Sequence, residues 1–98
     1  MRTESYDEFL QEQLRDPELA AEYLTVAAEE GSAELFLIAL RNVTEAQGGI
    51  AEIAAATHLN RQTMYRTLSS EGNPTLSTLL SILRAVGLNL SFKPATST

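Results

Sequence analysis

The chain is 98 residues long, 44% of them hydrophobic and 20% charged, which predicts a single folded domain and excludes a disordered or fibrous protein. The absence of cysteine excludes a disulfide framework, and the longest apolar run, LFLIAL, is too short to span a bilayer, so we expect a cytoplasmic protein without a membrane span. The net charge of −6 is unevenly distributed, because residues 1–49 hold three arginines and eleven acids whereas residues 50–98 hold four basic residues and two acids. This division suggests a basic partner for the first half and DNA for the second, although a solvated acidic face would also account for it.

Two helices are predicted in the first third of the chain. Apolar residues recur along one helical face over residues 6–15, which predicts the first helix. Asp16 and Pro17 form a helix-start signal for a second helix over residues 17–30, and Gly31 suits a left-handed end. The inner face of the second helix is expected to consist of Leu19, Tyr23, Leu24 and Ala27.

A third helix is predicted over residues 33–47, with Ser32 as its cap and two glycines after it. Its LFLIAL run is apolar almost all round, which is typical of a central helix packed on more than one side. Phe36 and Leu40 are therefore expected core residues.

The strongest functional signal lies at residues 49–69, where two short helices follow one another across a tight turn. The small Ala54 allows the second helix to cross the first at close range. Leu59 is expected to anchor the turn, and Asn60 is a candidate cap of the second helix. The inward side of this unit is expected to consist of Ile50, Ile53, Ala54, Leu59, Met64 and Leu68.

The outward side chains of the second helix suit contact with DNA. Arginine can form two hydrogen bonds with guanine in the major groove, glutamine can do the same with adenine, and hydroxyl groups can bind phosphates. The alternative is an ordinary helical hairpin with a charged outer face. We predict DNA contacts by Asn60, Arg61, Gln62, Thr63, Tyr65, Arg66 and Ser69.

This segment resembles the helix-turn-helix of the phage repressor/Cro type. That type has apolar residues and a small alanine at the positions matched here by Ile53, Ala54, Leu59 and Met64. His58 stands where the type usually has glycine, and histidine is among the residues that tolerate a positive φ. The resemblance implies that the second helix is a recognition helix.

A last helix is predicted after the turn-forming tract SSEGNP. Asn73, Pro74 and Thr75 together form its start signal, and Gly87 is expected to end it. Its inner stripe is expected to consist of Leu76, Leu79, Leu80, Leu83 and Val86.

Residues 88–93, LNLSFK, alternate between apolar and polar side chains, which predicts a β-strand that Pro94 stops. A lone strand leaves its backbone groups unpaired, so we expect it to pair with the same strand of a second copy or with the edge of a partner's sheet. The alternative is an extended tail on its own core. In a symmetric dimer, two recognition helices would meet successive major grooves about 34 Å apart.

A wider resemblance spans residues 6–90. The tracts YDEFL, DPELAAEYL, FLIALRNV, GGIAEIA, MYRTLSSEGNP and LLSILRAVGLNL are similar to those of addiction-module antidote proteins, the HigA-like antitoxins. The resemblance implies neutralisation of a small basic ribonuclease toxin of the RelE/HigB type and repression of the protein's own operon, usually as a homodimer. The candidate toxin-contact region is residues 1–31. The alternatives are a stand-alone repressor without a toxin and a helical adaptor that does not touch DNA.

Enzymatic activity is not expected. The single histidine, His58, lies in a predicted turn without a metal-ligand spacing motif, and the adjacent Glu29 and Glu30 face different directions on a helix. No cofactor or metal is therefore predicted. We expect an all-α fold of five to six short helices in one domain: the N-terminal helices of residues 1–31, a helix-turn-helix core of residues 32–87, and a C-terminal β-strand of residues 88–94.

Overall fold

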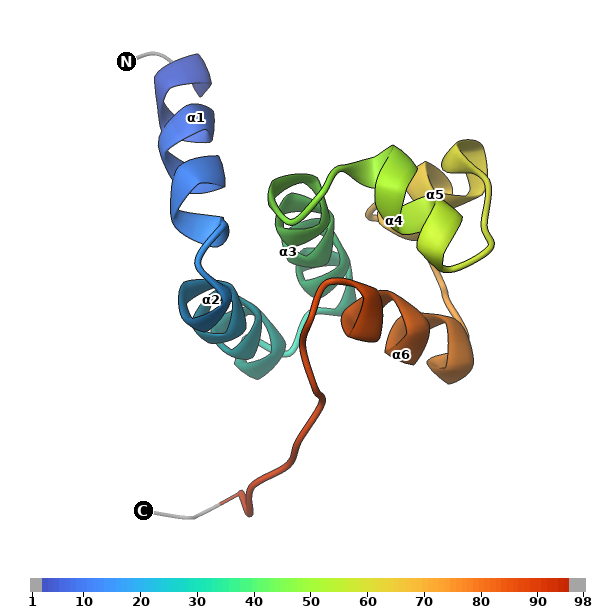
Figure 1. The fold of residues 1–98 in the computed structure, drawn as a ribbon. Helices are drawn as coiled ribbons and strands as arrows, with labels where there is room; N and C mark the ends of the chain where they lie inside the picture. The colour runs from blue at the N-terminus through green and yellow to red at the C-terminus, as the bar shows by residue number, and fades with distance from the viewer. Residues whose placement is uncertain (1–2, 96–98) are drawn as a thin grey trace.

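The computed structural model describes residues 3–95 and shows six helices over this part of the chain (Figure 1). They are α1 (Thr3–Leu14), α2 (Pro17–Glu29), α3 (Ala33–Ala46), α4 (Ile50–Ala56), α5 (Arg61–Thr67) and α6 (Leu76–Ala85). α3 contacts α1, α2 and α4, while α4 contacts α5 and α6, so the N-terminal pair and the C-terminal trio lie on different sides of α3. The all-α class is confirmed. Within the described residues, no helix has the length and apolar character needed to cross a membrane.

Side-chain caps start the helices where the sequence predicts them. Asp16 Oδ1 accepts a hydrogen bond from the backbone N–H of Glu18 (2.9 Å), and Ser32 Oγ accepts one from Leu35 (3.2 Å). These bonds satisfy amides that have no partner inside the helix. Gly31 adopts φ +84°, the left-handed conformation predicted for the end of α2.

α3 is the central helix, as its apolar run predicts. Leu40 and Val43 are fully buried, and Phe36 packs against the core from a half-buried position. Thr44 is the buried polar residue of this helix, and its hydroxyl donates to the carbonyl of Leu40 (2.8 Å), which removes the cost of burying an unpaired group. The remaining fully buried large side chains are Leu14, Met64, Leu68 and Ile82.

Polar side chains tie the first two helices to α3. Asn42 Nδ2 donates to the Tyr23 hydroxyl (2.9 Å), and Gln11 Nε2 donates to the Asn42 carbonyl (3.1 Å). Gln47 Nε2 donates to the carbonyl of Leu14 (2.8 Å) at the end of α1. These contacts fix α1 and α2 on α3 in addition to the apolar packing.

Two leucines predicted to face inward lie on the surface. Tyr23, Leu24 and Ala27 of α2 pack in or on the core as predicted. Leu19 is 37% exposed, and the small Ala20 is fully buried in its place. Leu76 is 64% exposed because it begins α6, ahead of the buried turns that contain Ile82 and Leu83. A periodic pattern predicts the apolar face of a helix, but the packing of its neighbours determines the rotation of that face.

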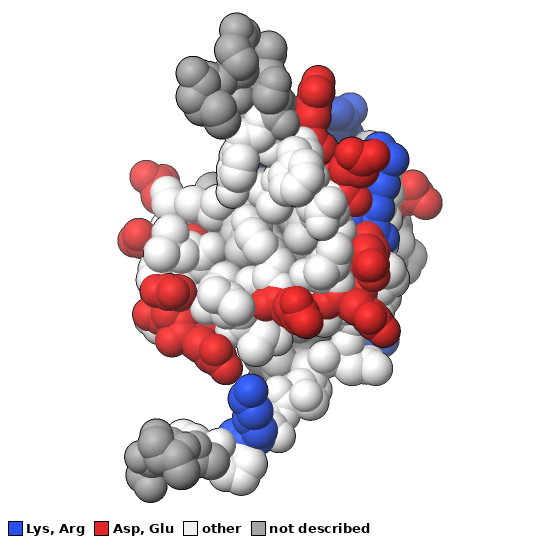
Figure 2. All heavy atoms as spheres, turned by 90° about the vertical axis from the view of Figure 1, so that its left-hand side faces the viewer, with Lys and Arg blue, Asp and Glu red and all other residues white. Residues whose placement is uncertain are grey.

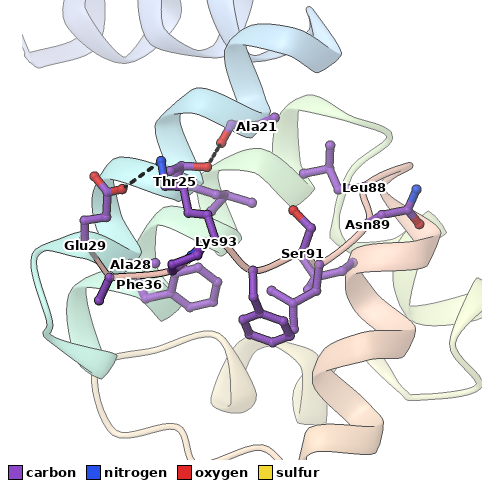
Figure 3. Close-up of a pocket in the computed structure, with 15 residues that line it drawn as sticks. Ala21, Thr25, Ala28, Glu29, Phe36, Leu88, Asn89, Ser91 and Lys93 are labelled. Carbon is purple, nitrogen blue, oxygen red and sulfur yellow. Dashed lines mark hydrogen bonds and ion pairs between the residues drawn. The ribbon is translucent and has the colours of Figure 1, made fainter.

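The predicted C-terminal strand is not present. Residues 88–95 are extended without forming a strand, since the described part of the chain is otherwise helical and offers no sheet edge for a ladder of hydrogen bonds. Leu88 packs against the core, whereas Phe92 is 87% exposed. This segment and α2 line a pocket of about 590 Å³ between them (Figure 3). Lys93 Nζ of the segment lies 3.6 Å from Glu29 Oε2 of α2.

Candidate nucleic-acid interface

α4 and α5 form a compact pair of short helices joined by a four-residue connection. Ile53 and Ala54 of α4 are buried, and Met64 of α5 is fully buried against them. Leu59 in the connection packs on the same core from a half-buried position. The predicted inward side of this unit is therefore confirmed, and the opposite side of α5 is left to the solvent.

The turn between α4 and α5 depends on His58, whose φ is +63°. The Leu59 N–H donates to the Ala54 carbonyl (2.9 Å) and the His58 N–H donates to the Ala55 carbonyl (3.2 Å), which is the hydrogen-bond pattern of a Schellman motif. The Thr57 hydroxyl adds a bond to the Ile53 carbonyl (2.9 Å). His58 therefore occupies the left-handed position that glycine usually takes at such helix ends.

The start of α5 is held by Asn60. Its Oδ1 accepts a hydrogen bond from the Thr63 N–H at 2.7 Å, which confirms the predicted cap. Thr63 itself is half-buried behind this cap. The Asn60 side chain thus holds the start of the helix in place, whatever contact it makes with a ligand.

Four of the seven predicted DNA-contact residues share the exposed face of α5. At one- and four-residue spacings along the helix they form a single strip, and all of them are exposed. They are Arg61, Gln62, Tyr65 and Arg66. The strip offers two fixed positive charges, an amide and a phenol, which are the donor and acceptor types that base edges and phosphates require.

Ser69, the seventh predicted residue, lies just beyond α5 and is half-buried. Its hydroxyl donates to the Arg66 carbonyl (2.8 Å) and accepts a hydrogen bond from the Glu71 N–H (3.3 Å). In the free protein this hydroxyl is thus engaged in closing the end of the helix.

Arg41 of α3 was not anticipated as a neighbour of this strip. Its guanidinium carbon lies 5.8 Å from the centroid of the Tyr65 ring, and its Nε is 3.5 Å from Glu45 Oε2. In the sequence, the spacing of Arg41 and Glu45 is typical of an ordinary surface ion pair on one helix. No local signal connects Arg41 to α5, because the contact depends on how α3 and α5 are placed relative to each other.

The loop after α5 contains a second feature that the sequence did not reveal. A Cβ on Gly72 would lie 1.9 Å from the carbonyl oxygen of Thr67, far closer than two such atoms can approach. The Gly72 N–H donates to the Ser69 carbonyl (2.9 Å), and Thr75 then caps α6 by accepting from the Thr78 N–H (3.1 Å). Glycine is therefore needed for the loop to pack against the last turn of α5.

The acidic helices lie away from this strip. α1 and α2 occupy one side of α3, whereas α4 and α5 occupy the other (Figure 1). Across residues 50–95 the basic side chains are Arg61, Arg66, Arg84 and Lys93 against only Glu52 and Glu71. The excess of negative charge, which would repel DNA, thus lies mainly outside α5 and its neighbours α4 and α6.

Comparison with known proteins shows a match to a described protein family. Residues 3–94 match the model of a family described as "Probable addiction module antidote protein". An uncharacterized protein of Haemophilus influenzae is 34% identical over 92 residues, which cover 93% of this chain and 92% of that relative. No solved structure matches the chain.

Proposed function

The chain belongs to the family of probable addiction module antidote proteins, and on that basis we propose that it is the antitoxin of a type II toxin–antitoxin module that binds both a toxin and its own operator. The toxin is a small basic ribonuclease of the RelE/HigB type, and the operator is duplex DNA upstream of the module. The observation that carries the DNA-binding half of this proposal is the exposed strip of Arg61, Gln62, Tyr65 and Arg66 on a capped helix after a tight turn.

In the proposed complex α5 enters the major groove. The two arginines and the glutamine of the strip contact base edges, while hydroxyl groups and backbone amides contact phosphates. The buried Met64 anchors the opposite side of α5, so the strip is presented by a rigid element. The segment from α4 to α6 carries few acidic residues. The electrostatic repulsion between α5 and the DNA phosphates is therefore weaker than the net charge of −6 suggests.

Repression is proposed to need two copies of the chain. A homodimer would place two α5 helices about 34 Å apart on a palindromic operator. Leu90 and Phe92 are exposed on the extended tail, and apolar side chains on such a segment favour contact with another molecule. The half of the chain that carries the acidic excess would remain free for a basic toxin.

Co-expression with the neighbouring reading frame tests the toxin half of the proposal. A small basic protein that co-purifies with this chain, and whose ribonuclease activity is lost on mixing, is the expected result. Gel-shift with the upstream region of the gene tests the operator half. Specific DNA binding without any captured partner would instead identify a stand-alone repressor, and the absence of DNA binding would leave a protein-binding adaptor.

A further inference from the structure

A shallow groove of about 580 Å³ runs between α1, α2 and α3. Its lining is almost entirely apolar, and it exposes large aliphatic side chains that a folded monomer would ordinarily bury. Val26 is 57% exposed and Leu35 is 54% exposed, and Leu19 and Ile38 continue the same surface. This surface, defined by Leu19, Val26, Leu35 and Ile38, is called the aliphatic groove below.

The charged residues of the aliphatic groove are all acidic. Glu22 and Glu30 line it, and Glu18 lies one helical turn before Glu22. α2 contains no basic residue, and the ion pairs among the described residues, Arg41 with Glu45 and Lys93 with Glu29, involve none of these acids. Figure 2 shows the side of the molecule formed by α1 and α2 as a broad uncharged area bordered mainly by acidic side chains, with basic side chains at its right-hand edge and below it.

We propose that the aliphatic groove is the docking surface for the basic partner protein, an inference that rests on the antitoxin function proposed above. The exposed aliphatic side chains would form the dry centre of the interface, and Glu22 and Glu30 would form its polar rim. The partner fragment that fits is an apolar helix or strand flanked by lysine or arginine. Charge complementarity selects such a partner over DNA, which the acids repel, and over a second copy, which would bring like charges together.

The position of the groove separates the two binding activities. α1 and α2 lie on one side of α3, and the exposed strip of α5 lies with α4 on the other. Changes in the groove should therefore alter capture of the partner and leave operator binding unchanged. Operator binding by a groove variant therefore serves as a test that the variant is still folded.

Charge reversal tests the groove with the full-length protein. The probe is the polypeptide encoded by the reading frame beside this gene, titrated against wild type, the groove variant Glu22→Lys/Glu30→Lys and the control Glu8→Lys/Glu12→Lys. Both double variants change the net charge equally, but Glu8 and Glu12 lie outside the groove. We expect the Kd of the groove variant to rise about tenfold or more, and that of the control to stay within about threefold of wild type.

An aliphatic substitution supplies an independent test. Val26→Ser is compared with Leu76→Ser, which alters a similarly exposed side chain on α6. The first should weaken partner binding by about fivefold or more, and the second should leave it unchanged. Operator gel-shift and circular dichroism of the groove variants should match wild type.

Each other outcome is decisive. Equal loss of binding in the two charge-reversal variants would mean that only long-range attraction acts, which overturns the groove but leaves the antitoxin function intact. A changed sedimentation coefficient of the free groove variant, with partner binding unaltered, would assign the groove to self-association and overturn the proposal. Absence of binding by wild type would refute the antitoxin function itself.

Discussion

The guanidinium of Arg41 lies over the ring of Tyr65, with 5.8 Å between its central carbon and the ring centroid. The contact joins α3, the central helix of the fold, to the exposed strip of α5. A cation over an aromatic face is attracted to the ring, and at an exposed site this attraction is worth about 0.5–1 kcal/mol. Tyr65 is therefore a member of the strip that contacts a side chain of the central helix.

A double-mutant cycle should measure this coupling. Arg41→Ala, Tyr65→Ala and the double variant are expected to give an interaction energy of about 0.5–1 kcal/mol in urea unfolding, the range of an exposed cation–π pair. The same cycle on Arg61 and Tyr65, which share α5 without such a contact, serves as control. A coupling for Arg41 no larger than that for Arg61 would contradict the structural role of the pair.

Local signals were sufficient to predict most of the fold. The caps Asp16, Ser32 and Asn60 and the left-handed Gly31 lie where the sequence places them, because each acts within four residues of its own position. The buried side of the helix pair was also predictable, since helical periodicity determines it once the turn is located. These signals define the candidate interface on α5.

Features that depend on distant parts of the chain were not predictable. The contact of Arg41 with Tyr65 requires the relative placement of two helices, which no spacing encodes. The alternation of residues 88–93 correctly indicates an extended segment, but a strand also needs a partner edge, and the described helices provide none. The exposure of Leu19 likewise follows from the close packing of Ala20.

His58 should limit the stability of the turn. A non-glycine residue at φ +63° carries a conformational cost, so His58→Gly is expected to raise the free energy of unfolding by about 0.5–1 kcal/mol. His58→Val should lower it by about 1–2 kcal/mol, because β-branched residues are poorly accommodated there. Thermal unfolding should show shifts of about 4–8 °C per kcal/mol for a domain of this size. The reverse order of the two variants would refute the left-handed assignment.

Gly72→Ala should destabilise the protein through a steric conflict. The new Cβ would lie 1.9 Å from the Thr67 carbonyl oxygen, so the loop must move away from α5, at a cost of about 1–3 kcal/mol or more. Gly31→Ala is the matched control, because its added Cβ meets nothing within 4 Å and only the left-handed φ of +84° is penalised, by about 1–2 kcal/mol. Urea unfolding should show the smaller loss for Gly31→Ala and, for Gly72→Ala alone, weaker operator binding as well.

The extended tail is expected to support the proposed homodimer. Leu90→Ser/Phe92→Ser removes two exposed apolar side chains without touching the core residue Leu88. Sedimentation should show a shift toward monomer, and operator affinity should fall by about tenfold or more because the two half-sites are no longer bound by one linked pair. Leu76→Ser, an equally apolar surface change on α6, should alter neither property. A wild-type protein that sediments as a monomer would contradict the dimer.

The arginines of α5 provide the sharpest test of DNA recognition. Arg61→Ala and Arg66→Ala should each weaken operator binding by about 1–3 kcal/mol if the side chain reads a base, and the discrimination against unrelated DNA should shrink accordingly. Arg84→Ala removes the same charge from α6 and serves as the control for general electrostatics. Partner capture should be unchanged in all three variants, because the acidic helices lie on the other side of α3. If Arg84→Ala weakened operator binding as much as the α5 variants, net charge rather than the exposed strip would account for DNA affinity, and α5 would not be the recognition helix.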